Sequence, residues 1–123
     1  MDQSAAFNIS TIAKMVGSDL VEPMLVSYQE TMQAQLTKLI TIVATQSTSE
    51  LHRLAHSIKS SAKFIGSDAL SEFCFQLEMK TAADPEWHSD YARQVEELCQ
   101  RSRDVLEQVT IYLEQQKVSN RCQ

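Results

Sequence analysis

Apolar side chains recur at spacings of three and four residues along most of this chain. That period places them on one face of an α-helix, whereas a half-buried strand would show strict alternation. The pattern predicts five helices, at about residues 8–16, 20–45, 48–65, 68–82 and 84–117. The expected buried stripe of the second helix is Leu25, Tyr28, Met32, Leu36, Leu39 and Val43, and that of the last helix is Tyr91, Val95, Leu98, Ser102, Val105, Val109 and Tyr112.

Glycine, proline and capping residues mark the ends of these helices. The triplet Gly-Ser-Asp occurs at residues 17–19 and again at 66–68. In both places glycine suits the left-handed position that ends a helix, and Ser or Asp can cap the next helix. Ser47 and Glu50 form a capping-box pattern for the third helix. The sequence Asp-Pro-Glu at 84–86 predicts the start of the last helix, because all three residues favour a helix N-terminus.

Four long amphipathic helices joined by short connections predict an all-α fold, an antiparallel four-helix bundle. The first, short helix is expected to cover one end of it. The chain has only two glycines and two prolines, which argues against a sheet with many tight turns. We therefore expect residues 1–123 to form a single domain, with a core at about 7–117 and a frayed tail at about 118–123.

Composition and charge narrow the classes of function. The formal net charge is −5, which disfavours binding to nucleic acid or to an anionic membrane surface. No stretch approaches the roughly 20 apolar residues of a membrane span, and the N-terminus lacks the pattern of a secretion signal. Cys74, Cys99 and Cys122 are too widely spaced for a disulfide framework or a metal box. We expect a cytoplasmic protein in which Cys74 and Cys99 are core residues and Cys122 lies exposed in the tail.

The third helix carries the residues with the clearest chemical potential. At roughly 100° per residue, its apolar side chains fall within an arc of roughly 160° to 260° measured from His56. His56 therefore points away from the core, and it shares the polar face with His52, Lys59, Ser60 and Lys63. The apolar arc consists of Leu51, Leu54, Ala55, Ile58, Ala62 and Ile65.

This face suits a histidine that carries a phosphoryl group. Neutral imidazole is a nucleophile near pH 7, because its ordinary pKa is about 6.5. A phosphoryl group on His56 would add close to two negative charges, and Lys59 at i+3 could neutralise part of them. Ser60 at i+4 is small, so a partner surface could approach the ring. Lys63, two turns away, would act more weakly.

The residue pattern alone allows other interpretations of these histidines. A histidine on a polar helix face is most often a solvated surface residue. His52 and His56 could bind a metal as a pair, but two histidines alone do not complete a zinc site, so no metal is expected. We interpret His52 as a surface residue that could tune His56, and His88 has no evident partner. The sequence shows no nucleophile–base set and no paired carboxylates, which are the groups that would indicate an autonomous enzyme.

The run from His56 to Ala62 (His-Ser-Ile-Lys-Ser-Ser-Ala), followed by Gly66, resembles the signature of the histidine-containing phosphotransfer (HPt) domains of bacterial two-component phosphorelays. In that signature a histidine is followed by a lysine, a glycine, two small residues and a further glycine. The downstream Leu70, Cys74 and Leu77-Glu78 also match the next helix of the family. The Lys-Ser-Ser-Ala run is similar to stand-alone proteins of the quorum-sensing type.

The resemblance implies a role for each matched residue. His56 matches the phosphorylated histidine, Lys59 the lysine that assists the phosphoryl group, and Gly66 the glycine that ends the active helix. Ser60 departs from the family, because it stands where a glycine usually leaves room beside the ring. Serine there could still provide space or donate a hydrogen bond.

The resemblance also implies a phosphocarrier without autonomous catalytic activity. It would accept a phosphoryl group from the receiver-domain aspartate of a sensor or hybrid histidine kinase. It would then pass the group to the aspartate of a response regulator. No cofactor is expected on this chain, since Mg²⁺ would be held by the receiver, and we expect a monomer. The alternative is a helical docking module that binds a receiver or kinase without phosphotransfer. Candidate docking residues on the first two helices are Phe7, Ile9, Ile12, Met15 and Met24.

Overall fold

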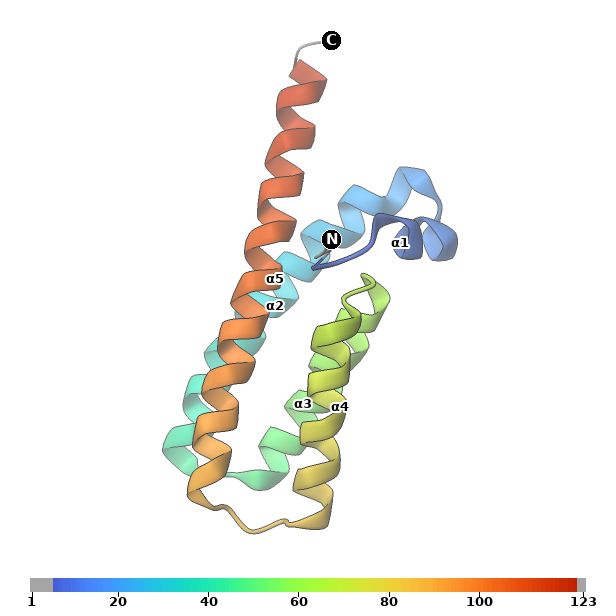
Figure 1. The fold of residues 1–123 in the computed structure, drawn as a ribbon. Coiled ribbons are helices and arrows are strands. Elements are labelled where there is room, and N and C mark those ends of the chain that lie inside the picture. Colours follow the sequence, from blue (N-terminus) through green and yellow to red (C-terminus); the bar gives the residue numbers. More distant parts are fainter. Residues whose placement is uncertain (1–5, 122–123) are drawn as a thin grey trace.

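The computed structural model describes residues 6–121 and contains only helices and their connections in that range (Figure 1). The predicted all-α fold is confirmed. In chain order, the elements are α1 (Ile9–Val16), the short 3₁₀ helix η1 (Ser18–Leu20), α2 (Val21–Thr45), α3 (Thr48–Phe64), α4 (Asp68–Ala83) and α5 (Ser89–Arg121). Four of the helix starts lie within a residue or two of their predicted positions.

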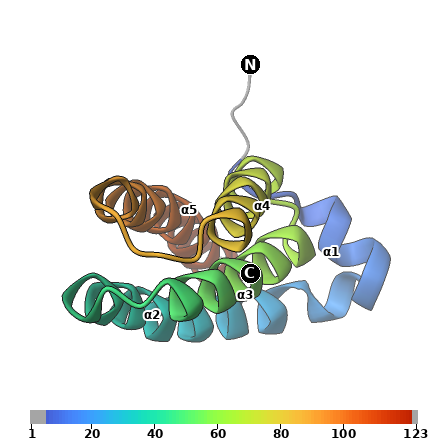
Figure 2. The same ribbon diagram turned by 90° about the horizontal axis from the view of Figure 1, so that it is seen from below.

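The helices α2 to α5 form the bundle, and α1 lies beside one end of it (Figure 2). Seen along its length, the bundle has α2 and α3 on one side and α4 and α5 on the other. The core runs through the middle. The predicted apolar arc of the third helix is buried in full, and α4 buries Leu70, Cys74, Leu77 and Thr81. Its largest fully buried side chains are Tyr91, Ile12, Leu25, Met32, Leu39, Leu51, Ile58, Ile65, Leu70, Leu77, Leu98 and Val95.

The buried face of α2 differs from the prediction in its second half. Gln35 and Ile42 are buried, whereas Leu36 is only partly buried and Val43 is 37% exposed. Successive buried residues of a helix can be spaced by three and then four positions, or by four and then three. Both orders give the same average period, so the sequence alone does not decide between them. The packing of α2 against both α3 and α5 selects the face that carries Gln35 and Ile42.

The prediction that α5 starts at Asp84 is wrong. The Asp84 N–H donates to the Lys80 carbonyl at 2.9 Å, so Asp84 ends α4 instead. The Tyr91 hydroxyl donates to the Asp84 carbonyl at 2.6 Å and fixes the connection that precedes α5. At its other end α5 is helical through Arg121, so residues 118–121 continue the helix where we expected fraying.

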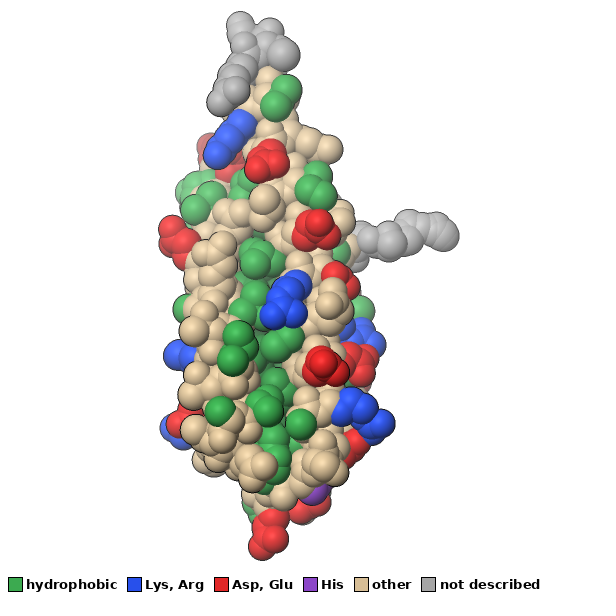
Figure 3. Space-filling view, turned by 90° about the vertical axis from the view of Figure 1, so that its left-hand side faces the viewer, with side chains coloured by type: hydrophobic (Ala, Val, Ile, Leu, Met, Phe, Trp, Pro, Cys, Tyr) green, Lys and Arg blue, Asp and Glu red, His purple; other side chains and the backbone are tan. Residues whose placement is uncertain are grey.

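One side of the bundle, formed by α2 and α5, carries a stripe of apolar side chains between charged ones (Figure 3). A hollow on this side is lined by residues from both helices, including Ile40, Val43, Val95 and Cys99. The α3 helix contributes nothing to its lining, so this stripe lies on a different face from His56. Within residues 6–121, none of the helices contains an apolar stretch of the length that spanning a bilayer requires.

Gly66 follows α3 in the chain and packs against the start of α1. It has a φ of +75°, and its N–H donates to the Lys63 carbonyl at 3.1 Å. Next to it, the Asn8 N–H donates to the Ile65 carbonyl at 2.8 Å. A Cβ atom at Gly66 would lie 2.6 Å from the Asn8 Cβ atom and 2.9 Å from the Thr11 hydroxyl. The glycine therefore supplies both a left-handed turn and the space that α1 occupies.

We predict that Gly66→Ala lowers the free energy of unfolding by about 2 kcal/mol or more, because it adds a steric overlap to the strain of a positive φ. Urea denaturation followed by circular dichroism measures this loss. Gly17→Ala is a matched control, since Gly17 has a φ of +90° but no atom within 4 Å of its added Cβ. Equal losses in the two variants would show that the contact with α1 contributes nothing.

Candidate functional site

The third helix presents His56 to solvent in the way that its sequence predicts. The Ser47 hydroxyl accepts the Glu50 N–H at 3.3 Å and caps the start of α3. The predicted apolar face of α3 is buried throughout, from Leu51 to Ile65. On the other side, the His56 side chain is 59% exposed. Burial of one face thus fixes the rotation of α3 and directs His56 outward.

A carboxylate from α4 connects the two key residues of α3. Glu78 Oε2 lies 2.8 Å from His56 Nδ1, and Glu78 Oε1 lies 2.7 Å from Lys59 Nζ. The Lys59 side chain is only 25% exposed, and its ammonium group lies 5.4 Å from the centroid of the Phe75 ring. His56 and Lys59 are therefore held by the two oxygens of one carboxylate.

The electrostatics of this cluster favour an ionised Glu78. The Lys59 ammonium beside it holds the pKa of the Glu78 carboxyl below its usual range; partial burial opposes this effect, and the bond to His56 adds to it. An ionised carboxylate can only accept hydrogen bonds, so His56 Nδ1 must carry the proton. In a neutral imidazole the other nitrogen, Nε2, then has the free lone pair. In that tautomer, Nε2 of His56 is the ring nitrogen available to act as a nucleophile.

We predict a pH signature of this pairing in the stability of the protein. A carboxyl whose folded pKa is depressed stabilises the fold above its unfolded value, ordinarily about 4.5, and loses that contribution as the pH falls through the folded value. The wild type should therefore exceed Glu78→Gln in free energy of unfolding near pH 7, and the difference should shrink below about pH 4. Urea titrations at both pH values measure it. A difference that grows on acidification would contradict the pairing.

Ser60 does not bond to the ring in this structure. Its hydroxyl donates to the His56 main-chain carbonyl at 3.2 Å, one turn back along α3. Beside it lies a hollow of about 300 Å³ between α2 and α3, and Met24, Tyr28 and Phe64 contribute to its lining. The serine therefore occupies the rim of an apolar recess next to the exposed histidine.

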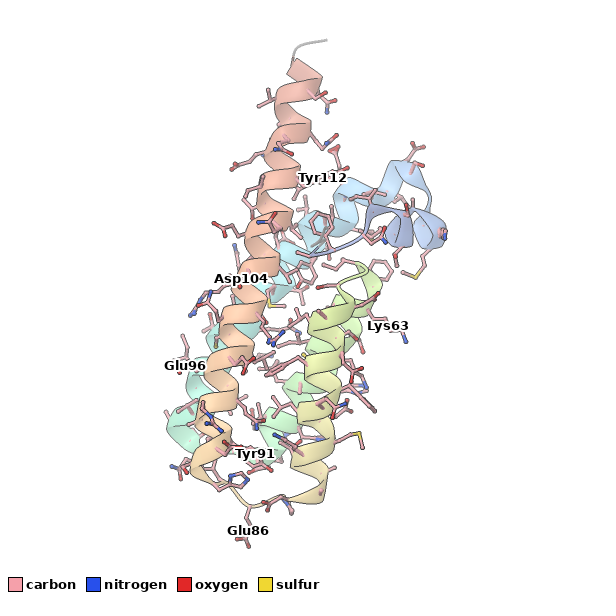
Figure 4. All side chains as sticks on the ribbon, in the orientation of Figure 1. Lys63, Glu86, Tyr91, Glu96, Asp104 and Tyr112 are labelled. Atoms are coloured by element: carbon pink, nitrogen blue, oxygen red, sulfur yellow. The ribbon has the colours of Figure 1, made fainter. Side chains whose placement is uncertain are left out.

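His52 has a different role from the surface position that we expected. It is partly buried, and its Nδ1 lies 2.9 Å from the Thr81 hydroxyl and 3.1 Å from the Glu78 main-chain carbonyl. This ring therefore links α3 to α4. Lys63, in contrast, is exposed, and Figure 4 shows it on the outer side of α3, away from α5.

The remaining residues singled out from the sequence are also accounted for. His88 does have partners, because its Nε2 lies 3.2 Å from Asp84 Oδ2 and its ring lies over Tyr91 at 4.0 Å between centroids. Cys74 and Cys99 are buried as predicted, and burial raises the pKa of the Cys74 thiol to about 12. Cys122 lies outside the described residues.

The candidate docking residues divide into three groups. Ile12 is fully buried, so it cannot meet a partner, whereas Phe7 is partly buried and packs edge-on against Tyr112 of α5. Ile9 is partly buried against the core. Met15 is 53% exposed and Met24 lines the recess beside Ser60, so these two remain candidates.

Sequence reasoning missed two features of α4 at this site. Phe75 and Met79 are 40% and 54% exposed, and they lie three residues before and one residue after Glu78. Glu78 itself was matched to the family only as part of a helix, with no role. The sequence shows that Glu78 lies one turn after Cys74, on the same side of the helix. It does not show how α4 is oriented against α3, and that orientation is what brings Glu78 to His56.

Among the described residues, no group of three or more His, Cys, Asp or Glu side chains is arranged to hold a metal ion.

The sequence profile of the Hpt domain matches residues 23–121. No curated protein sequence matches the chain significantly. Among solved structures, histidine-containing phosphotransfer protein B from Pseudomonas aeruginosa PAO1 superimposes with a TM-score of 0.72 at 18% identity, covering 95% of this chain and 98% of the other.

Proposed function

The chain belongs to the Hpt domain family, and on that premise we propose that it is a phosphorelay intermediate whose phosphoacceptor is Nε2 of His56. Membership makes it a phosphotransfer module of two-component signalling. The proposal adds the atom and the sequence of transfers: a receiver-domain aspartate of a sensor or hybrid kinase donates, and the aspartate of a response regulator accepts. The protein would act as a monomer in the cytoplasm, where such receivers are found.

In the proposed transfer, the Nε2 lone pair attacks the phosphorus of an aspartyl phosphate. The N–P bond forms while the bond from phosphorus to the aspartate oxygen breaks, and the aspartate leaves as a carboxylate. The imidazole gains positive character as its lone pair is donated, and the Nδ1–H stays bonded to Glu78. The negative carboxylate stabilises that charge, as an orienting acid does for other catalytic histidines. Return to a second receiver is the same reaction reversed.

Lys59 has two tasks in this account. In the free protein its ammonium is paired with Glu78, which keeps the carboxylate beside His56. An ammonium has three N–H donors, so it can also meet an oxygen of the arriving phosphoryl group. Mg²⁺ would be held in the acidic pocket of the receiver, and it would share the neutralisation of the transition-state charge with Lys59.

The surroundings of His56 suit docking of a larger partner. The apolar recess beside Ser60 lies towards α2, and the exposed Phe75 and Met79 lie on α4. Exposed apolar side chains that lie together among polar residues often mark a site of interaction with another protein. We propose that receivers dock over this surface, with His56 at its centre.

The observation that carries the proposal is the bond from Nδ1 of the exposed His56 side chain to Glu78, which leaves Nε2 as the nitrogen with the free lone pair when the ring is neutral. The experiment that tests it is transfer profiling. Purified receiver domains, each labelled on its aspartate with radioactive phosphate, are mixed one by one with the protein. At least one should pass label to this chain, and the bound label should be lost in acid but kept in base. Failure of every receiver from the same genome would refute the proposal.

The alternative is a docking module without transfer, and Ser60 is the residue that favours it. We predict instead that Ser60 only tunes the rate. Ser60→Gly should change the transfer rate by about threefold or less, because the hydroxyl is bonded to its own helix. It should also cost about 0.5 kcal/mol of stability, since glycine is a poorer helix former than serine. Transfer reactions quenched at successive times measure the rate, and urea denaturation measures the stability. A rate increase of a hundredfold or more in the variant would support the docking module.

A further inference from the structure

The two histidines of α3 share an arrangement that phosphotransfer does not require. His52 and His56 lie one turn apart on the same helix, and both bring Nδ1 to an acceptor on α4. For His56 the acceptor is the Glu78 carboxylate, at 2.8 Å. For His52 it is the main-chain carbonyl of the same residue, at 3.1 Å, together with the Thr81 hydroxyl.

These contacts fix the tautomer of His52 as well. A carbonyl oxygen can only accept, and the Thr81 hydroxyl has its own main-chain acceptors, the carbonyls of Leu77 and Glu78, at 3.0 Å each. His52 Nδ1 is therefore the donor, and in the neutral ring Nε2 then carries the lone pair. When both rings are neutral, the imidazoles at i and i+4 each have a free Nε2 lone pair.

This is the outer shell that metal-bound histidines have. A histidine that ligates a metal through one nitrogen usually donates its other N–H to a carboxylate or a main-chain carbonyl. Imidazole nitrogen prefers Zn²⁺, Cu²⁺ or Ni²⁺ over the hard cations Mg²⁺ and Ca²⁺, which prefer oxygen. Side chains at i and i+4 on a helix are neighbours, with Cβ atoms about 5–6 Å apart, and such a pair supplies two ligands to zinc in helical sites.

We propose that His52 and His56 form a two-histidine site for a borderline transition-metal cation such as Zn²⁺, and that the bound cation blocks phosphorylation of His56. Water would complete the coordination shell, so the site is open and its occupancy reversible. The second half of the proposal rests on the proposed function, because the cation and the phosphoryl group would compete for the same Nε2 lone pair.

Calorimetric titration of the full chain with Zn²⁺, in the presence of a phosphine reductant, tests the site without any phosphorylation. We expect about one ion per chain. His52→Gln and His56→Gln should each weaken binding at least tenfold, and His88→Gln should leave it unchanged. His56 is exposed, so His56→Gln tests the site even if His52→Gln is unstable. Binding that both variants retain, or that His88→Gln weakens equally, would overturn the proposal.

Competition is tested with phosphoramidate, a small phosphoryl donor that needs no receiver. Zn²⁺ at a concentration just sufficient to saturate the wild type should slow labelling of the wild type at least tenfold and should slow labelling of His52→Gln by less than threefold. Equal inhibition of both proteins would overturn the competition. Absence of labelling in metal-free wild type would instead count against the proposed function, and the calorimetric result would still stand for the metal site.

Discussion

Replacement of His56 by glutamine is expected to abolish phosphoryl acceptance. The variant removes the exposed imidazole that the Glu78 carboxylate orients, so labelling from any phosphorylated receiver should fall by at least about 1,000-fold. The fold should survive, because the side chain is largely exposed and the glutamine amide can still donate to Glu78. We expect a change in the free energy of unfolding of no more than about 0.5 kcal/mol.

The measurement is a transfer time course with a labelled receiver, beside urea denaturation of the same preparation. His88→Gln is the matched control, since His88 is also exposed but lies in the connection between α4 and α5. It should be labelled at the wild-type rate. A His56→Gln variant that remains folded and is labelled normally would end the assignment.

Removal of the Lys59 ammonium is expected to have the second largest effect. Lys59→Ala should slow transfer by about 100-fold, the range found when one donor to a developing negative charge is removed. Two losses combine in this variant: the phosphoryl oxygens lose a cation, and Glu78 loses the ion pair that holds it beside His56. Single-turnover rates at saturating receiver concentration measure the effect. An unchanged rate would show that the charge argument is wrong.

A Glu78 variant separates the two losses. Glu78→Gln removes the carboxylate but leaves Lys59 free, and we expect transfer to slow by about tenfold because the ring is less well oriented. If Lys59 acted only through Glu78, Lys59→Ala would lose nothing more in the Glu78→Gln background. If it also meets the phosphoryl group, the double variant should be slower than Glu78→Gln alone. The cycle therefore measures the share of each task.

The fold and the outward face of α3 were predictable because they depend on helical periodicity. Burial of Leu51, Ile58 and Ala62 determines where His56 points, and these positions follow from spacing alone. The start of α5 was not predictable in the same way. Asp-Pro-Glu is a good local start signal, but the Asp84 N–H continues α4 and its carbonyl accepts from Tyr91, seven residues later.

The part of the site that the sequence did not reveal depends on how α3 and α4 face each other. Glu78 lies 22 residues after His56, and no spacing rule relates residues on two packed helices. The partners of His52 on α4 were hidden for the same reason, so a residue interpreted as solvated became a link between helices. Local patterns were enough to select His56 as the candidate nucleophile, whereas the groups that contact its ring depend on tertiary packing.

The position of the phosphoryl group on the protein tests the proposed mechanism directly. The protein is labelled uniformly with ¹⁵N, phosphorylated by a cognate receiver, and examined by long-range ¹H–¹⁵N spectra of its histidine rings alongside tandem mass spectrometry. We expect one phosphoryl group, on Nε2 of His56, with the proton retained on Nδ1. A phosphoryl group on Nδ1 of His56, or on any other residue, would contradict the proposed mechanism.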